Sequence, residues 1–181
     1  EPLEISVVGD FDPEAVVQAA ARYFGGLHAR PGRKGPAAAA VPQFPVDQRL
    51  ALEVKSDIPK GLVVVAYPTD DFWDIHRTRR LSVLAEVFSD RLRLRVREKL
   101  GAAYSPHAYN WSSRAFPGFG ILRAMVSVDP RDAERIAVEV RDIAAALARE
   151  GVAADERQRA LEPILTSLRE MQRTNRYWLE R

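Results

Sequence analysis

A stretch rich in proline, glycine and alanine divides this 181-residue chain into two unequal parts. Residues 28–50 contain four prolines, two glycines and a run of four alanines, and they show no sustained apolar period. Such a composition is typical of an extended linker, because proline and glycine interrupt both helices and strands. The sequence therefore predicts a short N-terminal part, residues 1–27, and a body, residues 51–181, that is long enough for one hydrophobic core.

The N-terminal part is expected to hold one strand and one helix. Residues 3–8 are rich in Ile and Val and end at Gly9-Asp10, which favours a strand. Asp12-Pro13 favours a helix start, because the carboxylate accepts orphan amide hydrogens and the proline needs no donor. Gly25-Gly26 is expected to end that helix. Two elements of this size have little to bury, so we expect residues 1–27 to be the remnant of a preceding domain.

The body is expected to begin with two strands and a long helix. The strands are expected at 51–55 and 62–67, and the valine run of the second suggests burial on both faces. Apolar residues then recur every three or four positions over 72–100, which predicts a helix. Residues 91–97 also alternate Arg with Leu or Val, a pattern typical of a strand, but continuity with the upstream apolar stripe favours the helix.

The rest of the body is expected to supply a hairpin and two helices. The extended segments 104–113 and 118–128 are predicted to pair with each other. One helix should begin after Asp129-Pro130 and end at Gly151, and the last should run from about Ala154 to the terminus with a bend at Pro163. This order of elements predicts an α+β fold in which helices pack on a mostly antiparallel sheet.

Composition excludes several classes of protein. Hydrophobic residues make up 46% and charged residues 29% of the chain, as in globular proteins and unlike disordered ones. No apolar run approaches the roughly 18 residues of a membrane span, and the first residues lack the basic start and apolar stretch of a signal peptide. Cysteine is absent, so disulfides, thiolate metal sites and a cysteine nucleophile are excluded.

The sequence predicts no metal site and no self-contained catalytic centre. His28, His76 and His107 are far apart, and none has a second histidine four residues away on a helix. Ser89 and Ser105 lack the motif of a serine nucleophile. No glycine-rich phosphate loop precedes a helix.

The junction between the long helix and the following strand carries the clearest candidate site. Arg97 lies in the last expected helical turn and Tyr104 opens the next strand, with Gly101 between them. The two side chains can converge at one edge of the sheet, where a guanidinium can bind peptide carbonyls or a carboxylate. A phenol beside it can donate to an oxygen that gains negative charge. In the structural alternative, Arg97 pairs with a surface carboxylate and Tyr104 packs in the sheet.

This junction resembles a known family. Asp90-Arg91-Leu92 and residues 96–105 are similar to the R-L … L-R-E-K-x-G-L-A-Y-S segment of pitrilysin/insulinase-type zinc metallopeptidases, which include the mitochondrial processing peptidases. Residues 7–13 together with residues 23–27 resemble the strand and helix that close the family's preceding domain, and residues 151–156 lie where the family begins a helix with G-V-T-x-x-E-L. Ala102, Ala153 and the lead-in 87–90, which lacks glycine, depart from the family pattern.

The resemblance implies two related α+β halves that enclose a chamber for unfolded peptides. One half carries an inverted H-x-x-E-H zinc motif, which this chain lacks, and the other carries an Arg/Tyr pair, which Arg97 and Tyr104 match. By implication the chain is the non-zinc domain or subunit of a zinc metalloendopeptidase, with no cofactor of its own and no activity alone. Zinc is expected on the partner, and a peptide or unfolded protein is the expected substrate. Many bacterial relatives are exported, so the resemblance suggests the periplasm.

The same resemblance implies a role for each residue of the pair. Arg97 would hold a backbone carbonyl of the substrate, and Tyr104 would hydrogen-bond the oxyanion formed by zinc-activated water.

Two alternatives stay open. Residues 77–99 contain eight basic and three acidic side chains, which would suit an arginine-rich nucleic-acid-binding module in which Tyr109 or Trp111 stacks on bases. Helical arginines more often cover a solvated face or line a peptide cavity, which disfavours that reading. The other alternative is a purely structural half that completes the chamber without a catalytic role.

Overall fold

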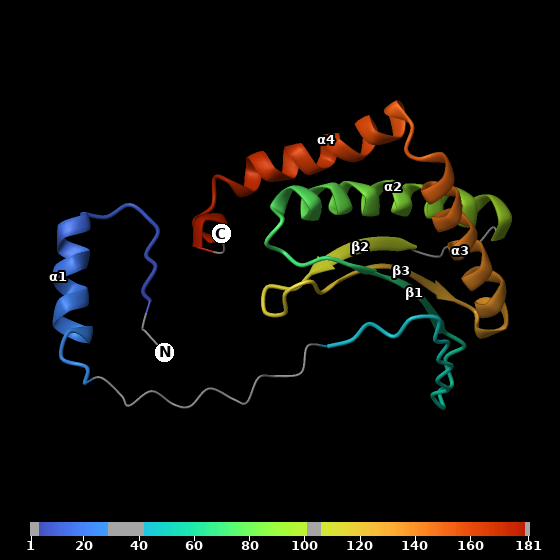
Figure 1. Ribbon diagram of the computed structural model, residues 1–181, viewed down its shortest axis with the longest axis horizontal. Helices are drawn as coiled ribbons and strands as arrows, with labels where there is room; N and C mark the ends of the chain where they lie inside the picture. The colour runs from blue at the N-terminus through green and yellow to red at the C-terminus, as the bar shows by residue number, and fades with distance from the viewer. Residues whose placement is uncertain (1–3, 29–41, 101–105, 180–181) are drawn as a thin grey trace. The chain divides into compact units, whose positions relative to one another are not determined.

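The computed structural model describes residues 4–28, 42–100 and 106–179, except for the side chains of 97–100 (Figure 1). The chain forms two units, residues 1–40 with 165–181 and residues 41–164. The helices are α1 (Pro13–Phe24), α2 (Ile75–Leu100), α3 (Ala133–Glu150), α4 (Ala154–Met171) and α5 (Asn175–Leu179), with a 3-10 turn at Pro130–Asp132. The strands are β1 (Gly61–Thr69), β2 (His107–Ser112) and β3 (Gly120–Val128). The predicted α+β class is confirmed.

Helix α1 begins and ends where its sequence predicts. The carboxylate of Asp12 accepts a hydrogen bond of 2.9 Å from the Glu14 amide, and Pro13 occupies the first turn. At the other end, the Gly25 amide donates to the Ala21 carbonyl at 2.9 Å. Both ends are therefore satisfied by the residue types that the sequence places there.

The three strands form one antiparallel sheet in the order β1-β3-β2, and the predicted hairpin of β2 and β3 is confirmed (Figure 1). Across the central strand, the Thr69 hydroxyl donates to the side-chain carbonyl of Asn110 at 3.2 Å. In the register Gly120 pairs with Thr69 on one side and Ser112 on the other, and a Cβ atom on Gly120 would clash with the Asp70 carbonyl oxygen. A glycine is therefore required where the chain at the end of β1 comes close to the start of β3.

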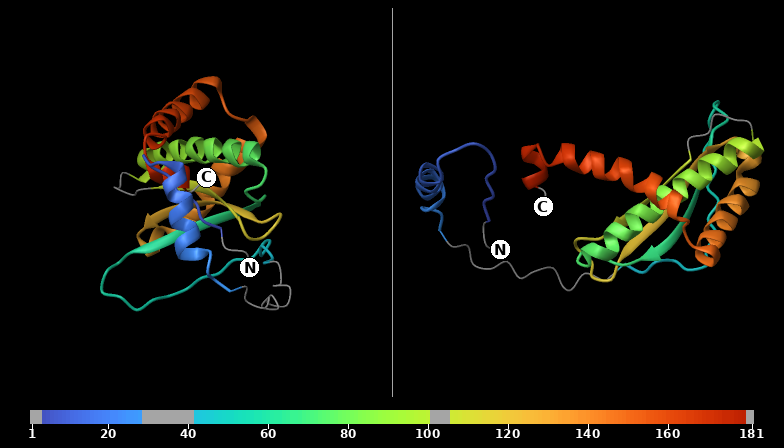
Figure 2. Two further views of the ribbon diagram at one scale, coloured as in Figure 1. Left: turned by 90° about the vertical axis from the view of Figure 1, so that its left-hand side faces the viewer. Right: turned by 90° about the horizontal axis from the view of Figure 1, so that it is seen from above.

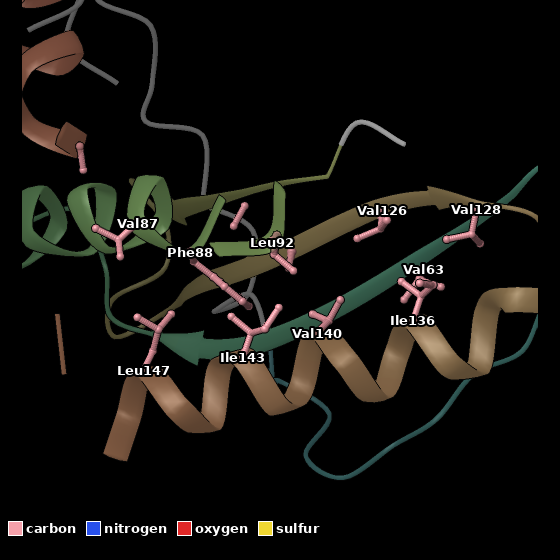
Figure 3. Close-up of a cluster of buried hydrophobic side chains, with 13 residues drawn as sticks. Val63, Val87, Phe88, Leu92, Val126, Val128, Ile136, Val140, Ile143 and Leu147 are labelled. Atoms are coloured by element: carbon pink, nitrogen blue, oxygen red, sulfur yellow. The ribbon is translucent and has the colours of Figure 1, made fainter. Parts of the chain in front are cut away.

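Helices α2 and α3 pack on the same face of the sheet (Figures 2 and 3). Figure 3 shows the apolar stripe of α3 pointing at side chains from β1 and β3. Four core side chains, Leu92, Val126, Ile136 and Val140, have no exposed surface. The predicted helix over 91–97 is thus confirmed, because Leu92 and Val96 are buried while Leu94 is 60% exposed. That burial follows the period of a helix and not the period of a strand.

The opposite face of the sheet is not covered by any described helix of residues 42–164. On β1, Val63 points into the core, but Leu62 is 55% and Val64 is 48% exposed. The expectation that the valine run is buried on both faces is therefore wrong. Strand β1 is an outer strand of an antiparallel sheet that has helices on one face only. Such a sheet can leave its second face exposed to solvent.

Two predicted strands are also wrong. Residues 4–8 and 51–55 adopt no regular structure, and Leu52 and Val54 are 77% and 85% exposed. Within the described residues, neither segment pairs with a strand. A single extended segment leaves its backbone groups to water and buries no apolar face, so a short run of strand-favouring residues alone does not make it a strand.

The last helix is shorter than predicted. Instead of continuing to the terminus, α4 ends at Met171, and the Thr174 hydroxyl donates to the Met171 carbonyl at 2.8 Å. The same hydroxyl accepts from the Tyr177 amide at 3.4 Å and so caps α5. Threonine competes in this way with the helical hydrogen bonds, which explains the break.

Candidate functional site

The candidate pair brackets the connection between α2 and β2. The backbone of Arg97 is helical and lies one turn before the end of α2, as predicted. Its side chain and the whole of Tyr104 lie outside the described residues. The convergence of these two side chains therefore stays a prediction, and the described residues around them show how the two ends of the connection are fixed.

Ser89 ties α2 to β2. Its side chain is buried, and its oxygen accepts a hydrogen bond of 2.7 Å from the Ala108 amide. The hydroxyl proton has two acceptors within reach, the carbonyls of Ala85 at 2.9 Å and Ala108 at 3.1 Å. One buried side chain thus holds a backbone position of β2 against the middle of α2, and buried hydrogen bonds of this kind are costly to break.

From the sequence alone, Ser89 is considered only as a nucleophile, and its role in joining α2 to β2 is not predicted. A signal was nevertheless present. Ser89 follows Ala85 by four residues and precedes Leu92 by three, so it lies on the apolar stripe of α2. A polar side chain on a buried stripe needs a hydrogen-bond partner, and here the partner is the neighbouring strand.

A salt bridge fixes α2 to the start of α4. The Glu156 carboxylate accepts from Nε and Nη2 of Arg91, both at 2.7 Å, and from the Ala153 amide at 3.0 Å. Arg91 also donates to the Gly151 carbonyl at 3.0 Å. Both charged side chains are only about 20% exposed, 21% for Arg91 and 20% for Glu156. Although Ala153 replaces the capping threonine expected from the family pattern, Glu156 still supplies the acidic half of a capping box.

Glu156→Gln is expected to lower the free energy of unfolding by about 1–2 kcal/mol near neutral pH. The hydrogen bond from Arg91 holds the pKa of the Glu156 carboxyl below its usual value of 4.5. A carboxyl whose folded-state pKa is lowered stabilises the fold above its unfolded-state pKa, and it loses that contribution as the pH falls through the folded-state value. The gap between variant and parent should therefore shrink below about pH 4.5, as measured by denaturant titration at several pH values.

Glu162→Gln is the matched control for this prediction, because Glu162 lies exposed on the same helix and bonds only to Gln158 within the described chain. Its effect should be small at every pH. A difference for Glu156→Gln that stays constant from neutral to acid pH would contradict the assigned role of the bridge.

Four of the six basic side chains that the structure describes on α2 are paired with carboxylates, several of which come from other elements. Ion pairs of this kind leave few free cations for phosphates, so the structure disfavours the nucleic-acid alternative. The pairs are Arg77 with Asp70, Arg91 with Glu156, Arg93 with Asp90 and Arg95 with Glu139.

Two open hollows lie beside Leu94 on α2. One, of about 440 Å³, faces the start of α4, and the other, of about 560 Å³, faces α3. The charged groups around the first are already paired with one another. The first hollow therefore presents no free charge that would point to a ligand.

Across the described parts of the chain, no three His, Asp or Glu side chains gather into a group that could hold a metal ion. His28, His76 and His107 are exposed at separate positions. The helices that the structure describes include none that is both long and apolar enough to cross a membrane.

Comparison with known proteins decides the family. Residues 2–164 match a family model described as the Peptidase M16 inactive domain. The chain belongs to this family. The resemblance to pitrilysin/insulinase-type metallopeptidases is thereby confirmed, and the chain is a non-catalytic domain of that peptidase family.

A solved structure supports the fold of this inactive domain. The periplasmic protease PqqL from Escherichia coli superposes with a TM-score of 0.67 at 18% sequence identity, over 94% of this chain. The chain spans only 19% of the length of that protease. No curated protein sequence matches the chain.

Proposed function

We propose that this inactive domain completes a zinc metalloendopeptidase, to which it contributes substrate binding and oxyanion stabilisation. The observation that supports the proposal is the place of the family-type segment, at the end of α2 and just before β2. The hydrogen bonds between Ser89 and Ala108 join these two elements. A rigid scaffold on both sides of a short connection is what positioning a substrate requires.

In this proposal the chain's own residues act on the substrate and not on the metal. A partner domain or subunit with the H-x-x-E-H motif would hold zinc, which supplies an activated water. Arg97 binds a backbone carbonyl next to the cut bond through its guanidinium. Tyr104 donates its phenolic hydrogen to the oxygen that becomes negatively charged as the water attacks. A peptide or unfolded protein is the substrate class that such backbone contacts serve.

The organisation and location of the chain form part of the same proposal. Residues 1–27 would be the remnant of a preceding domain, residues 28–50 a linker and residues 51–181 the domain that carries the Arg/Tyr segment. The E. coli protease PqqL is periplasmic, which supports a periplasmic location for this chain as well.

Arg97→Gln tests the proposal. In a protein or complex that contains the zinc-bearing partner, the change is expected to lower kcat/KM for peptide hydrolysis about tenfold, because one charge-assisted hydrogen bond to the substrate is lost. Arg80→Gln on the same helix is the control, since Arg80 is exposed and lies more than four turns away. Equal kcat/KM values for both variants and the parent would favour the purely structural half.

A further inference from the structure

The sheet presents an apolar face that none of the helices described in residues 42–164 covers. Residues on this face alternate with those of the core along each strand. The register places residues of β1 and β2 on either side of those of β3. Its larger apolar side chains are Leu62, Val64, Tyr109, Trp111, Ile121 and Met125.

Several of these side chains are well exposed. Leu62 is 55%, Val64 is 48% and Trp111 is 47% exposed, although all three belong to regular strands. Isolated apolar side chains are ordinary on a protein surface, but a contiguous patch contributed by three strands is typical of a binding surface. The patch is made of regular backbone, so it needs little rearrangement to receive a partner.

One cation lies in the middle of this patch. Arg123 belongs to the central strand, where the register pairs it with Ala66 on one side and Tyr109 on the other. Its guanidinium carbon lies 4.3 Å from the centroid of the Tyr109 ring. Tyr109 in turn stacks on His107, with 6.0 Å between the ring centroids and 9° between the planes. A contact with an aromatic ring does not consume the N–H donors of a guanidinium, so donors remain for another partner.

Arg123 lacks an acidic partner among the described residues. Its Nε is buried and makes no hydrogen bond. No Asp or Glu occupies the positions of β1, β2 and β3 that point to this face. A guanidinium without an acidic partner can bind a carboxylate through two parallel hydrogen bonds. This contrasts with α2, whose paired arginines already have carboxylates.

We propose that this face binds an extended, apolar segment of a peptide substrate and that Arg123 receives a carboxylate of that segment. The apolar side chains on either side bury the neighbouring residues of the peptide. The inference rests on the proposed function only for the class of partner, a peptide, and it uses neither Arg97 nor Tyr104. It adds a preference for peptides that carry either an acidic side chain or a free C-terminus close to apolar residues.

The charge on this face favours a peptide over a nucleic acid. Binding of a nucleic acid depends on several cations that neutralise successive phosphates. Arg123 is the one Arg or Lys among the strand positions that point to this face. One guanidinium within an apolar surround matches one carboxylate within an apolar peptide.

The experiment measures binding of short fluorescent peptides of Val, Leu and Thr to the full chain by anisotropy. One peptide ends in a free carboxylate, a second is amidated, and a third is amidated but contains one Glu. We expect one or both carboxylate peptides to bind about tenfold more tightly than the amidated peptide without Glu. Comparison of the first and third peptides tells whether the C-terminus or an acidic side chain supplies the carboxylate.

Variants assign the preference to Arg123. Arg123→Gln should remove the tenfold preference and leave binding of the amidated peptide without Glu nearly unchanged. Arg123→Lys keeps the charge but loses the fork of donors, and should retain only part of the preference. Arg80→Gln, at an exposed position on α2, should leave it intact. Val64→Thr preserves the shape of an exposed side chain on the patch and should weaken binding of all three peptides to a similar degree.

Three results would overturn the inference. The first is equal binding of all peptides to the parent chain. The second is a preference that survives in Arg123→Gln. The third is salt-sensitive binding of a single-stranded oligonucleotide that depends on Arg123 and is tighter than binding of the peptides. The proposed function is tested separately, because Arg97→Gln affects hydrolysis whether or not Arg123 selects a carboxylate.

Discussion

Tyr104→Phe is expected to slow peptide hydrolysis about a hundredfold in a protein or complex that contains the zinc-bearing partner, which is typical for the loss of one oxyanion donor. The phenolic hydrogen bond strengthens as negative charge develops on the substrate oxygen, so kcat should fall while KM changes little. The measurement is steady-state hydrolysis of a fluorogenic peptide, with a thermal unfolding curve to show that the variant remains folded.

Tyr67→Phe removes the same hydroxyl at a matched control position. Tyr67 lies half-buried on the core face of β1, where burial raises the pKa of its phenol. It lies on the face that packs against α3, so its loss should leave turnover unchanged. A full peptidase rate in Tyr104→Phe would show that the oxyanion role is wrong. If Arg97→Gln also left the rate unchanged, the two results would favour the purely structural alternative.

Leu92→Ala is expected to lower the free energy of unfolding by about 3 kcal/mol, within the usual range for a leucine removed from a packed core. Leu92 has no exposed surface and packs between α2, the sheet and α3 (Figure 3). The truncation loses apolar burial and leaves a cavity that rigid neighbours fill only in part. Denaturant unfolding of the chain, monitored by circular dichroism, measures the change.

Leu94→Ala provides the control two residues further along the same helix. Leu94 is 60% exposed, because positions two apart are rotated by about 200° around a helix. Its truncation should cost less than about 1 kcal/mol. In a strand, which the alternation of residues 91–97 also permits, Leu92 and Leu94 would share a face. Similar losses for both variants would therefore contradict the helical assignment.

Much of the fold could be predicted because its signals are local. The Asp-Pro starts at 12–13 and 129–130, and the stop at Gly151, rest on hydrogen bonds within a few residues of the chain. The apolar stripes of α2 and α3 were visible for the same reason. The strands predicted at 3–8 and 51–55 failed because a strand exists only with a neighbour, and local residue content does not say whether one is available.

The candidate site was predictable only in part. The place of Arg97 near the end of α2 follows from the apolar period and the glycine after it, and both can be seen in the sequence. The bridge from Arg91 to Glu156 joins residues 65 positions apart, and no local pattern selects that acid among the others. Arg123 gave no signal in the sequence either, because its isolation depends on which residues the register places beside it.

The hydroxyl of Ser89 also has a consequence for solubility. The backbone amide and carbonyl of Ala108 point away from β3, on the outer margin of the sheet, where a second polypeptide could add as another strand. Because Ser89 already accepts the amide hydrogen of Ala108 and lies within donating reach of its carbonyl, intermolecular strand addition at that point would first have to break a buried hydrogen bond. A residue that orients the connection to β2 thus also protects the molecule against self-association through this strand.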